Sequence, residues 1–208
     1  MSMRIGCGWD SHAFQPGVPL KIGGIAIDHP EGLAGHSDGD VLLHAITDAL
    51  LGALAVGDIG SFFPPGDPRW KNADSAIFLN LALEEVRTAG YRIVNVDTTL
   101  VLAAPKIGPI SGDMRQRVAE LLEIQPNAVG IKAKTPEGLN LDHVAQAQAV
   151  VLLESADDQV GIGLLEAEVD DPAKVDEVLT HIGVSEGLGT SKSRRMVPLP
   201  AFDTEDIT

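Results

Sequence analysis

Apolar and polar positions alternate with a short period near the start of the chain and with a helical period further on. Residues 4–9 and 20–27 are short apolar stretches that predict two β-strands. Residues 40–55 are rich in Leu and Ala and follow an acidic opening, which predicts a largely buried helix. Residues 62–68 contain three prolines and a glycine, so we expect a loop there. The first half of the chain is therefore expected to supply two strands and one helix.

The second half of the chain changes repeatedly between the strand period and the helix period. In order, the pattern predicts a helix at 74–88, a strand at 91–102, a helix at 109–122, a strand at 129–134 and a helix at 143–154. A β-α-β-α order of this kind is typical of a sheet with helices packed on one face.

The character of the sequence changes after about residue 155. The following stretch carries acidic pairs such as Asp157-Asp158, becomes rich in Gly and Ser, and has almost no periodicity at its end. We therefore expect two parts: a domain at 1–155 and an acidic, partly flexible appendage at 156–208, with one short helix at 173–179. The basic residues in the appendage, Lys192, Arg194 and Arg195, are interpreted as a solvated spot rather than an anion site.

Composition and charge narrow the class of protein. The 208 residues are 44% apolar, which excludes a wholly disordered chain. Fifteen basic against thirty acidic residues give a net charge of −15, whereas nucleic-acid binders need a basic face to neutralise phosphates. We therefore expect no nucleic-acid partner. An anionic substrate would need a local source of positive charge, and bound metal ions are the densest such source.

Three negative features predict a location in the cytoplasm. No apolar run approaches the roughly 18 residues of a membrane span. The start of the chain leads directly into the first predicted strand, so we expect no signal segment and no membrane association. The single cysteine, Cys7, forbids an internal disulfide and suits a reducing compartment.

Asp10, His12 and His44 are the best candidates for metal ligands. Asp10 and His12 are two residues apart on the run out of the first predicted strand, so the alternation places both side chains on one side, away from Cys7. His44 lies on the apolar helix with Asp40 and Asp48 one turn away on either side. Buried imidazoles and carboxylates are costly unless they are paired or bound to metal. We therefore expect His44 to bind a metal with one nitrogen while a neighbouring carboxylate holds the other N–H.

Two imidazoles and one carboxylate leave a coordination position open. This is typical of catalytic rather than structural zinc. The same ligands also suit non-haem Fe(II), and the sequence does not separate the two metals.

Three further segments are ambiguous when taken alone. Thr135 and Glu137 follow a strand and project to the same side, where they could serve a phosphate and a hard cation such as Mg²⁺. The turns at Ala104-Pro105-Lys106 and Asp58-Ile59-Gly60 each carry polar groups that would be ordinary in any turn.

Taken in order, these segments resemble the family of 2-C-methyl-D-erythritol 2,4-cyclodiphosphate synthases. These enzymes make a terpenoid precursor in the non-mevalonate pathway of isoprene biosynthesis. The resemblance covers roughly residues 3–155. It depends on Asp10 and His12, on the run from His36 to His44, on Thr47 to Gly52, on Gly57 to Gly60, on Phe63-Pro64, on Ala104-Pro105-Lys106 and on Lys132 to Glu137.

The resemblance implies an α+β fold with a mixed sheet, and a homotrimer whose sheets face the three-fold axis and whose active sites lie between subunits. It implies a phosphorus–oxygen lyase that cyclises 4-diphosphocytidyl-2-C-methyl-D-erythritol 2-phosphate and releases CMP. In this reaction the 2-phosphate attacks the β-phosphate of the same molecule.

Roles for single residues also follow from the resemblance. The zinc ligands would be Asp10, His12 and His44, and Glu137 would bind Mg²⁺ or Mn²⁺ with the substrate diphosphate. His36 and Thr135 would be catalytic, with His36 and Ser37 on the phosphates. The substrate's erythritol and cytidine parts would meet Asp58, Ile59, Gly60, Phe63, Ala104, Pro105, Lys106 and Lys134.

Some positions depart from the family. Val144 stands where the family has an arginine facing a central cavity that holds isoprenoid diphosphates, so we expect this anion clamp to be missing. Lys134 and Pro136 replace threonines, which would alter the nucleotide contacts and add a phosphate partner. Two alternatives remain open: an Fe(II) oxygenase, which usually has an all-β barrel, and a non-catalytic trimeric metal-binding scaffold.

Overall fold

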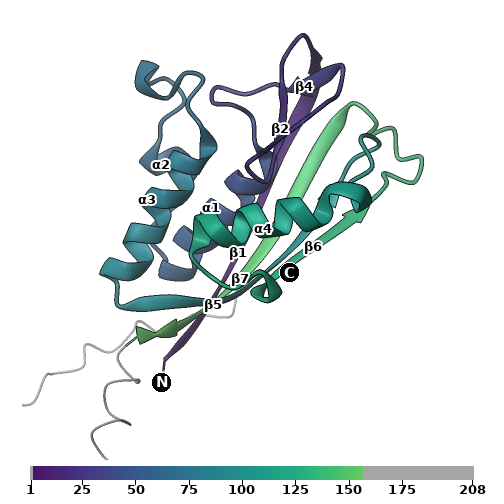
Figure 1. Cartoon of the computed structure of the whole chain (residues 1–208). Coiled ribbons are helices and arrows are strands. Elements are labelled where there is room, and N and C mark those ends of the chain that lie inside the picture. Colours follow the sequence, from purple (N-terminus) through teal and green to yellow (C-terminus); the bar gives the residue numbers. More distant parts are fainter. Residues whose placement is uncertain (1, 157–208) are drawn as a thin grey trace, which may run out of the picture. The chain divides into compact units, whose positions relative to one another are not determined.

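A five-stranded mixed sheet forms the centre of the structure, a computed structural model that describes residues 2–156 (Figure 1). The strand order is β4-β1-β7-β5-β6. The strands are β1 (Met3–Pro16), β4 (Glu31–Leu33), β5 (Tyr91–Val101), β6 (Val129–Lys134) and β7 (Val144–Ser155). Only β5 and β6 pair in parallel, and the other neighbours are antiparallel. A separate hairpin is made by β2 (Leu20–Ile22) and β3 (Ile25–Ile27).

The three long helices lie on the same face of this sheet (Figure 1). They are α1 (Val41–Leu54), α3 (Ser75–Thr88) and α4 (Ser111–Leu122), and the shorter turns are α2 (Ile59–Phe62), η1 (Pro68–Trp70), η2 (Gly108–Ile110) and η3 (Pro126–Ala128). The predicted α+β class, a mixed sheet with helices on one face, is confirmed. None of the helices in residues 2–156 has the length and hydropathy needed to cross a bilayer.

Most predicted elements are present, with some differences in extent. The three helices and the strands β5 and β6 match their predicted ranges to within about two residues. The first strand continues past its predicted end at residue 9 to Pro16. The predicted strand at 20–27 is instead a hairpin, because Gly23 and Gly24 adopt positive φ angles of 65° and 75° and turn the chain. The expectations for the appendage lie outside the described residues, apart from Ala156.

The predicted helix at 143–154 is wrong, since this segment is strand β7 at the centre of the sheet. Its alanines favour a helix, but its buried positions recur at every second residue: Ala145, Ala147, Ala149, Val151 and Leu153. The second half therefore runs β-α-β-β. Burial between two strands and under α1 outweighs the helix propensity of alanine.

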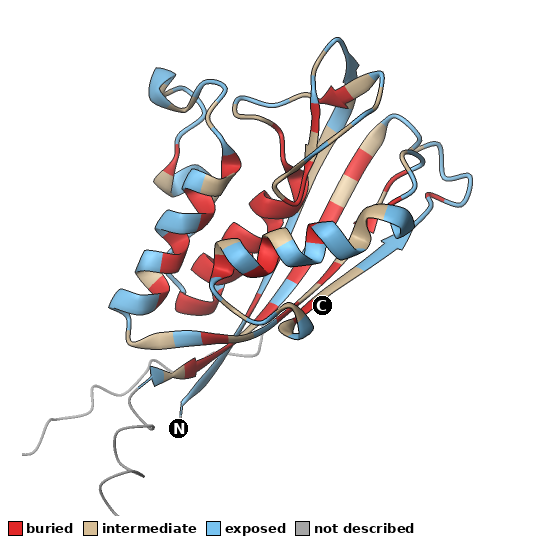
Figure 2. Cartoon of the chain, viewed as in Figure 1, coloured by how far each residue is buried: buried red, intermediate tan, exposed pale blue. Residues whose placement is uncertain are grey.

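Helix α1 lies unusually close to β1, and this contact positions the candidate site. A Cβ atom on Gly6 would lie 1.8 Å from the carbonyl oxygen of Ala49, and one on Gly8 would lie 2.0 Å from that of Ala45. Only glycine permits this approach. All but two of the 14 residues of α1 are buried (Figure 2), so the helix is fixed along the strand that carries Asp10 and His12.

The opposite face of the sheet is uncovered within residues 2–156 (Figure 2). Large apolar side chains point outward from it: Met3, Ile5 and Trp9 on β1 are 60%, 72% and 57% exposed, and Val150 on β7 is 39% exposed. Exposed apolar surface of this kind is typical of interaction surfaces.

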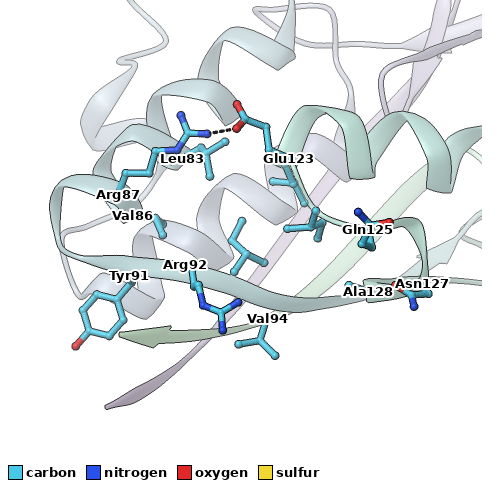
Figure 3. A pocket seen from close by; sticks show the side chains of 13 residues that line it. Leu83, Val86, Arg87, Tyr91, Arg92, Val94, Glu123, Gln125, Asn127 and Ala128 are labelled. Carbon is cyan, nitrogen blue, oxygen red and sulfur yellow. Dashed lines mark ion pairs between the residues drawn. The ribbon is translucent and has the colours of Figure 1, made fainter. Parts of the chain in front are cut away.

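A groove of about 550 Å³ lies between the C-terminal ends of α3 and α4 and the start of β5 (Figure 3). Arg87 points from α3 toward Glu123, and the two side chains form an ion pair at 2.5 Å. Arg92, also in this groove, pairs with Glu154. The groove contains none of the predicted site residues, and its arginines already have carboxylate partners.

Candidate metal centre and substrate cleft

Asp10, His12 and His44 converge on one point between β1 and α1. Asp10 Oδ2 lies 2.9 Å from His12 Nε2 and 2.9 Å from His44 Nδ1, and the two nitrogens are 3.1 Å apart. Such a group of ligand atoms could hold one metal ion. The alternation of β1 and the close packing of α1 are what bring these distant residues together.

The hydrogen bonds around the two imidazoles determine which nitrogens face this point. His12 Nδ1 lies 2.5 Å from the carbonyl oxygen of Ala34, which can only accept, so Nδ1 carries the proton. His44 Nε2 lies 2.8 Å from Ser75 Oγ and 3.1 Å from Ser37 Oγ. The Ser75 hydroxyl donates to Asp38, so it accepts from His44 Nε2–H.

When both rings are neutral in these tautomers, the converging atoms are one carboxylate oxygen and two ring nitrogens with free lone pairs. Acceptors this close repel one another unless a cation lies between them, and these three are standard zinc ligands. The residues present thus fit a divalent metal, and two imidazoles with one carboxylate leave a position open for another ligand.

The electrostatics of the centre favour a negative carboxylate beside positive charge. Burial opposes the charged carboxylate, but hydrogen bonds and charge from His12 and His44 lower the pKa of Asp10 well below its ordinary value. Burial likewise opposes a charged imidazole, while the Asp10 carboxylate raises the pKa of His12 above its ordinary value of 6.5. Asp10 is therefore an anion ready to bind a cation.

The predicted partners of His44 on its own helix are wrong. Asp40 is fully buried and accepts hydrogen bonds from the backbone N–H groups of Gly23, Gly24 and the first turn of α1, although burial raises its pKa. Asp48 accepts from the N–H of Ile59 at 2.7 Å. Both carboxylates satisfy orphan backbone donors, and the hydroxyls of Ser37 and Ser75 hold His44 instead.

A cleft of about 290 Å³ opens in front of the three ligands. Its walls contain several of the predicted substrate residues: His36, Ser37, Ile59, Gly60 and Phe63. His36 Nε2 is held 3.3 Å from the carbonyl oxygen of Asp67. Asp58 adjoins the cleft but does not line it, because its carboxylate accepts hydrogen bonds from Ser61 at the start of α2.

Three cleft residues were missed by the sequence analysis: Pro65, Trp70 and Phe78. The rings of Phe63 and Phe78 lie 4.5 Å apart, and Trp70 packs edge-on against both. A signal for the two aromatic residues was present in the sequence, since only 4% of the chain is aromatic and yet Phe63, Trp70 and Phe78 lie within 16 residues of one another. They form a stiff apolar wall beside the polar ligands.

The remaining predicted site residues form a second cluster at the C-terminal ends of β5 and β6. Because β5 and β6 are parallel, the turn with Ala104, Pro105 and Lys106 emerges beside Lys134, and the N–H of Leu102 donates to the Lys134 carbonyl at 3.1 Å. The exposed residues Thr135 and Glu137 point toward each other, with the hydroxyl donating to the carboxylate.

One chain does not bring the two clusters together. Ser11 on β1 pairs with Gln146 on β7, Gln146 pairs with Val101 on β5, and Val101 pairs with Lys134 on β6. Ser11 and Lys134 are therefore three strand spacings, or about 14 Å, apart. Asp10, His12 and His44 therefore lie near one edge of the sheet, and the Thr135–Glu137 cluster lies at the other edge.

Comparisons with known proteins agree on one family. Residues 3–154 match the model of the YgbB family. A relative from Koribacter versatilis, named 2-C-methyl-D-erythritol 2,4-cyclodiphosphate synthase, is 64% identical over 152 residues, which cover 73% of this chain and 98% of the relative. One of the same name from Moorella thermoacetica is 50% identical over 165 residues, covering 78% and 100%.

A solved structure of 2C-methyl-D-erythritol-2,4-cyclodiphosphate synthase in a form bound to CDP is also similar. It is 42% identical with a TM-score of 0.69, over 73% of this chain and all of that one. The bifunctional IspDF of Campylobacter jejuni is 34% identical with a TM-score of 0.71, over 74% of this chain and 42% of that protein.

Proposed function

This chain belongs to the YgbB family, and from that membership we infer that it is a 2-C-methyl-D-erythritol 2,4-cyclodiphosphate synthase of the non-mevalonate isoprenoid pathway. It converts 4-diphosphocytidyl-2-C-methyl-D-erythritol 2-phosphate into the cyclic diphosphate and CMP. The observation that carries the proposal is the convergence of Asp10, His12 and His44 beside a cleft, within a segment 64% identical to a relative of that name.

We propose that Asp10, His12 and His44 hold Zn²⁺ and that Glu137 holds Mg²⁺ or Mn²⁺. When bound, these ions supply positive charge to the phosphoryl groups that carry charge in the transition state. This would compensate for the acidic chain, whose net charge of −15 repels an anionic substrate.

The side chains of the cleft then bind and orient the substrate. His36 and Ser37 hold its phosphates beside the metal ligands, and Ile59, Gly60 and Phe63, with Asp58, surround its erythritol part. The nucleophile is already a phosphate anion, so no strong general base is needed, and positioning supplies most of the rate. The apolar wall limits water near the reacting groups.

The nucleotide belongs to the other cluster. The turn with Ala104, Pro105 and Lys106 receives the cytidine, Lys134 contacts a phosphate and Thr135 stabilises the transition state. The solved relative bound to CDP supports a cytidine ligand for this fold.

We further propose a homotrimer whose uncovered sheet faces surround the three-fold axis. Two observations support it: the exposed apolar residues on that face, and the distance of about 14 Å between the two clusters within a chain. In a trimer the metal cluster of one subunit can meet the Thr135–Glu137 cluster of the next. We expect no nucleic-acid or membrane partner and a cytoplasmic location.

The test of the function is incubation of the purified, zinc-loaded chain with the cytidyl substrate and Mg²⁺. Phosphorus NMR should show the cyclic diphosphate together with CMP. Metal analysis and an oxygen-uptake assay on the same sample distinguish zinc from an Fe(II) oxygenase. A metal-loaded trimer that forms no product would contradict the enzyme and leave the metal-binding scaffold.

The trimer is tested by Ile5→Glu, which places a carboxylate on the uncovered sheet face. We expect sedimentation at the single-chain mass of 21.9 kDa instead of three times that value, because charges buried around a symmetry axis repel and are desolvated. Ile77→Glu is the matched control, since Ile77 is 45% exposed on α3, away from that face. A wild-type chain that sediments as a monomer would contradict the trimer.

A further inference from the structure

Behind the proposed metal ligands, a chain of hydrogen bonds connects His44 to Lys21, which lies beside the N-cap residue of α3. His44 Nε2 lies 2.8 Å from Ser75 Oγ, and the Ser75 hydroxyl in turn donates to Asp38 Oδ1. Asp38 Oδ2 lies 2.9 Å from the ammonium group of Lys21, which also pairs with Asp74 at 2.8 Å. Three segments besides α1 therefore contribute to the support of one imidazole: β2, the loop before α1 and the start of α3.

The direction of each proton in this chain is fixed by chemistry. The Asp38 carboxylate can only accept, so it takes the single hydroxyl proton of Ser75 and also the Ser75 backbone N–H at 3.2 Å. Ser75 Oγ is left with lone pairs toward His44, which must present Nε2–H. The ion pair at 2.9 Å between Lys21 and Asp38 holds Asp38 in place. Burial opposes the charge of the Lys21 ammonium group, but Asp74 and Asp38 raise the pKa of Lys21.

The environment makes this arrangement rigid. Ser75 has no exposed surface, and His44 is only 8% exposed. Ser75 is the first residue of α3, and the preceding residue, Asp74, caps that helix through the N–H of Ala76. The other hydroxyl near His44 Nε2, that of Ser37, is more distant at 3.1 Å and lies on the substrate cleft.

We propose that Ser75 is a positioning residue of the zinc site: it fixes the ring of His44 in the tautomer that directs the Nδ1 lone pair at the metal, and Asp38 with Lys21 fixes Ser75. The inference rests on the zinc centre of the proposed function. Groups that orient metal-bound imidazoles in this way typically change metal affinity by about 10- to 100-fold.

The test is the zinc dissociation constant of Ser75→Ala, measured by competition with a chelator of known affinity. We expect zinc to bind about 10- to 100-fold more weakly than to the wild-type chain. Ser111→Ala is the matched control, because Ser111 is also the first residue of a helix, α4, and its hydroxyl contacts only the nearby Gly108 carbonyl. It should bind zinc within about two-fold of wild type.

A second variant and a second measurement protect the test against simple misfolding. Asp38→Asn keeps an acceptor oxygen for the Ser75 hydroxyl but removes the charge, so we expect a smaller loss of zinc affinity. In imidazole nitrogen NMR, the Nε2–H proton of His44 should be protected from solvent exchange in wild type and unprotected in Ser75→Ala. This signal is recorded on chelator-treated as well as zinc-loaded protein.

Two results would overturn the inference. In the first, Ser75→Ala binds zinc as tightly as wild type and keeps the protected Nε2–H signal. In the second, Ser75→Ala is unchanged and Ser37→Ala instead loses zinc affinity and the protected signal. Failure of the wild-type chain to bind zinc would contradict the metal centre itself, whereas the Nε2–H signal in chelator-treated protein would still show whether Ser75 holds His44.

Discussion

Replacing His44 by alanine is expected to abolish stoichiometric zinc binding and to lower turnover about 1000-fold, which corresponds to about 4 kcal/mol of transition-state stabilisation. The reason is geometric: His44 Nδ1 is one of the three ligand atoms that converge here within residues 2–156, and Asp10 and His12 alone would leave two coordination positions to water. Elemental analysis of zinc and the phosphorus NMR assay measure the two effects on the same sample.

His29→Ala is the matched control for this variant. The His29 ring packs near Phe14, and its Nδ1 bonds the carbonyl oxygen of Glu31, outside the cleft. It should keep both zinc and turnover. His44→Ala with full zinc content and wild-type turnover would show that the three converging acceptors are not the metal centre.

The convergence of Asp10, His12 and His44 could be predicted from the sequence because two simple periods determine the directions of these side chains. Alternation along β1 places Asp10 and His12 on one side, and the apolar surroundings of His44 indicate a buried helix. Their convergence depends on the close contact at Gly6 and Gly8, for which the sequence offered only the small size of these residues. The local pattern therefore predicts which side chains face the candidate site, whereas the distances between their atoms depend on how α1 packs against β1.

The supporting residues could not be predicted in the same way. Asp40 and Asp48 have the expected helical spacing from His44, yet both carboxylates are used by unpaired backbone N–H groups. The hydroxyl of Ser75 is 31 residues away on another helix. Which acceptor reaches His44 Nε2 depends on how α3 packs against α1, a tertiary contact with no periodic signal.

Strand β7 illustrates the same limit at the level of the fold. Its alternating alanines satisfy both a helix and a strand, and only its place between β1 and β5 decides between them. The error has a consequence for function, because β7 separates the metal edge of the sheet from β5 and β6. With β7 between them, Asp10 and Glu137 cannot belong to one compact site in a single chain.

Mixing two inactive variants should therefore restore activity. His44→Ala removes the metal cluster and Glu137→Ala removes the opposite cluster, and each homotrimer should be inactive. When the two chains are co-expressed with different affinity tags, one of the three sites in every mixed trimer, about a third of the sites, pairs an intact His44 with an intact Glu137 from the neighbouring chain. We expect turnover near that fraction of wild type in trimers that carry both tags.

The control is the pair His44→Ala with Asp10→Ala, in which both changes fall on the same cluster. Every metal cluster in those mixed trimers is defective, so no activity should return, although the chains assemble in the same way. Because restoration requires residues from two chains, recovered turnover in the first pair alone would place the site between subunits. Equal inactivity of both pairs, in trimers shown to contain both tags, would mean that Glu137 and His44 act within one chain and that the sheet edges do not meet as proposed.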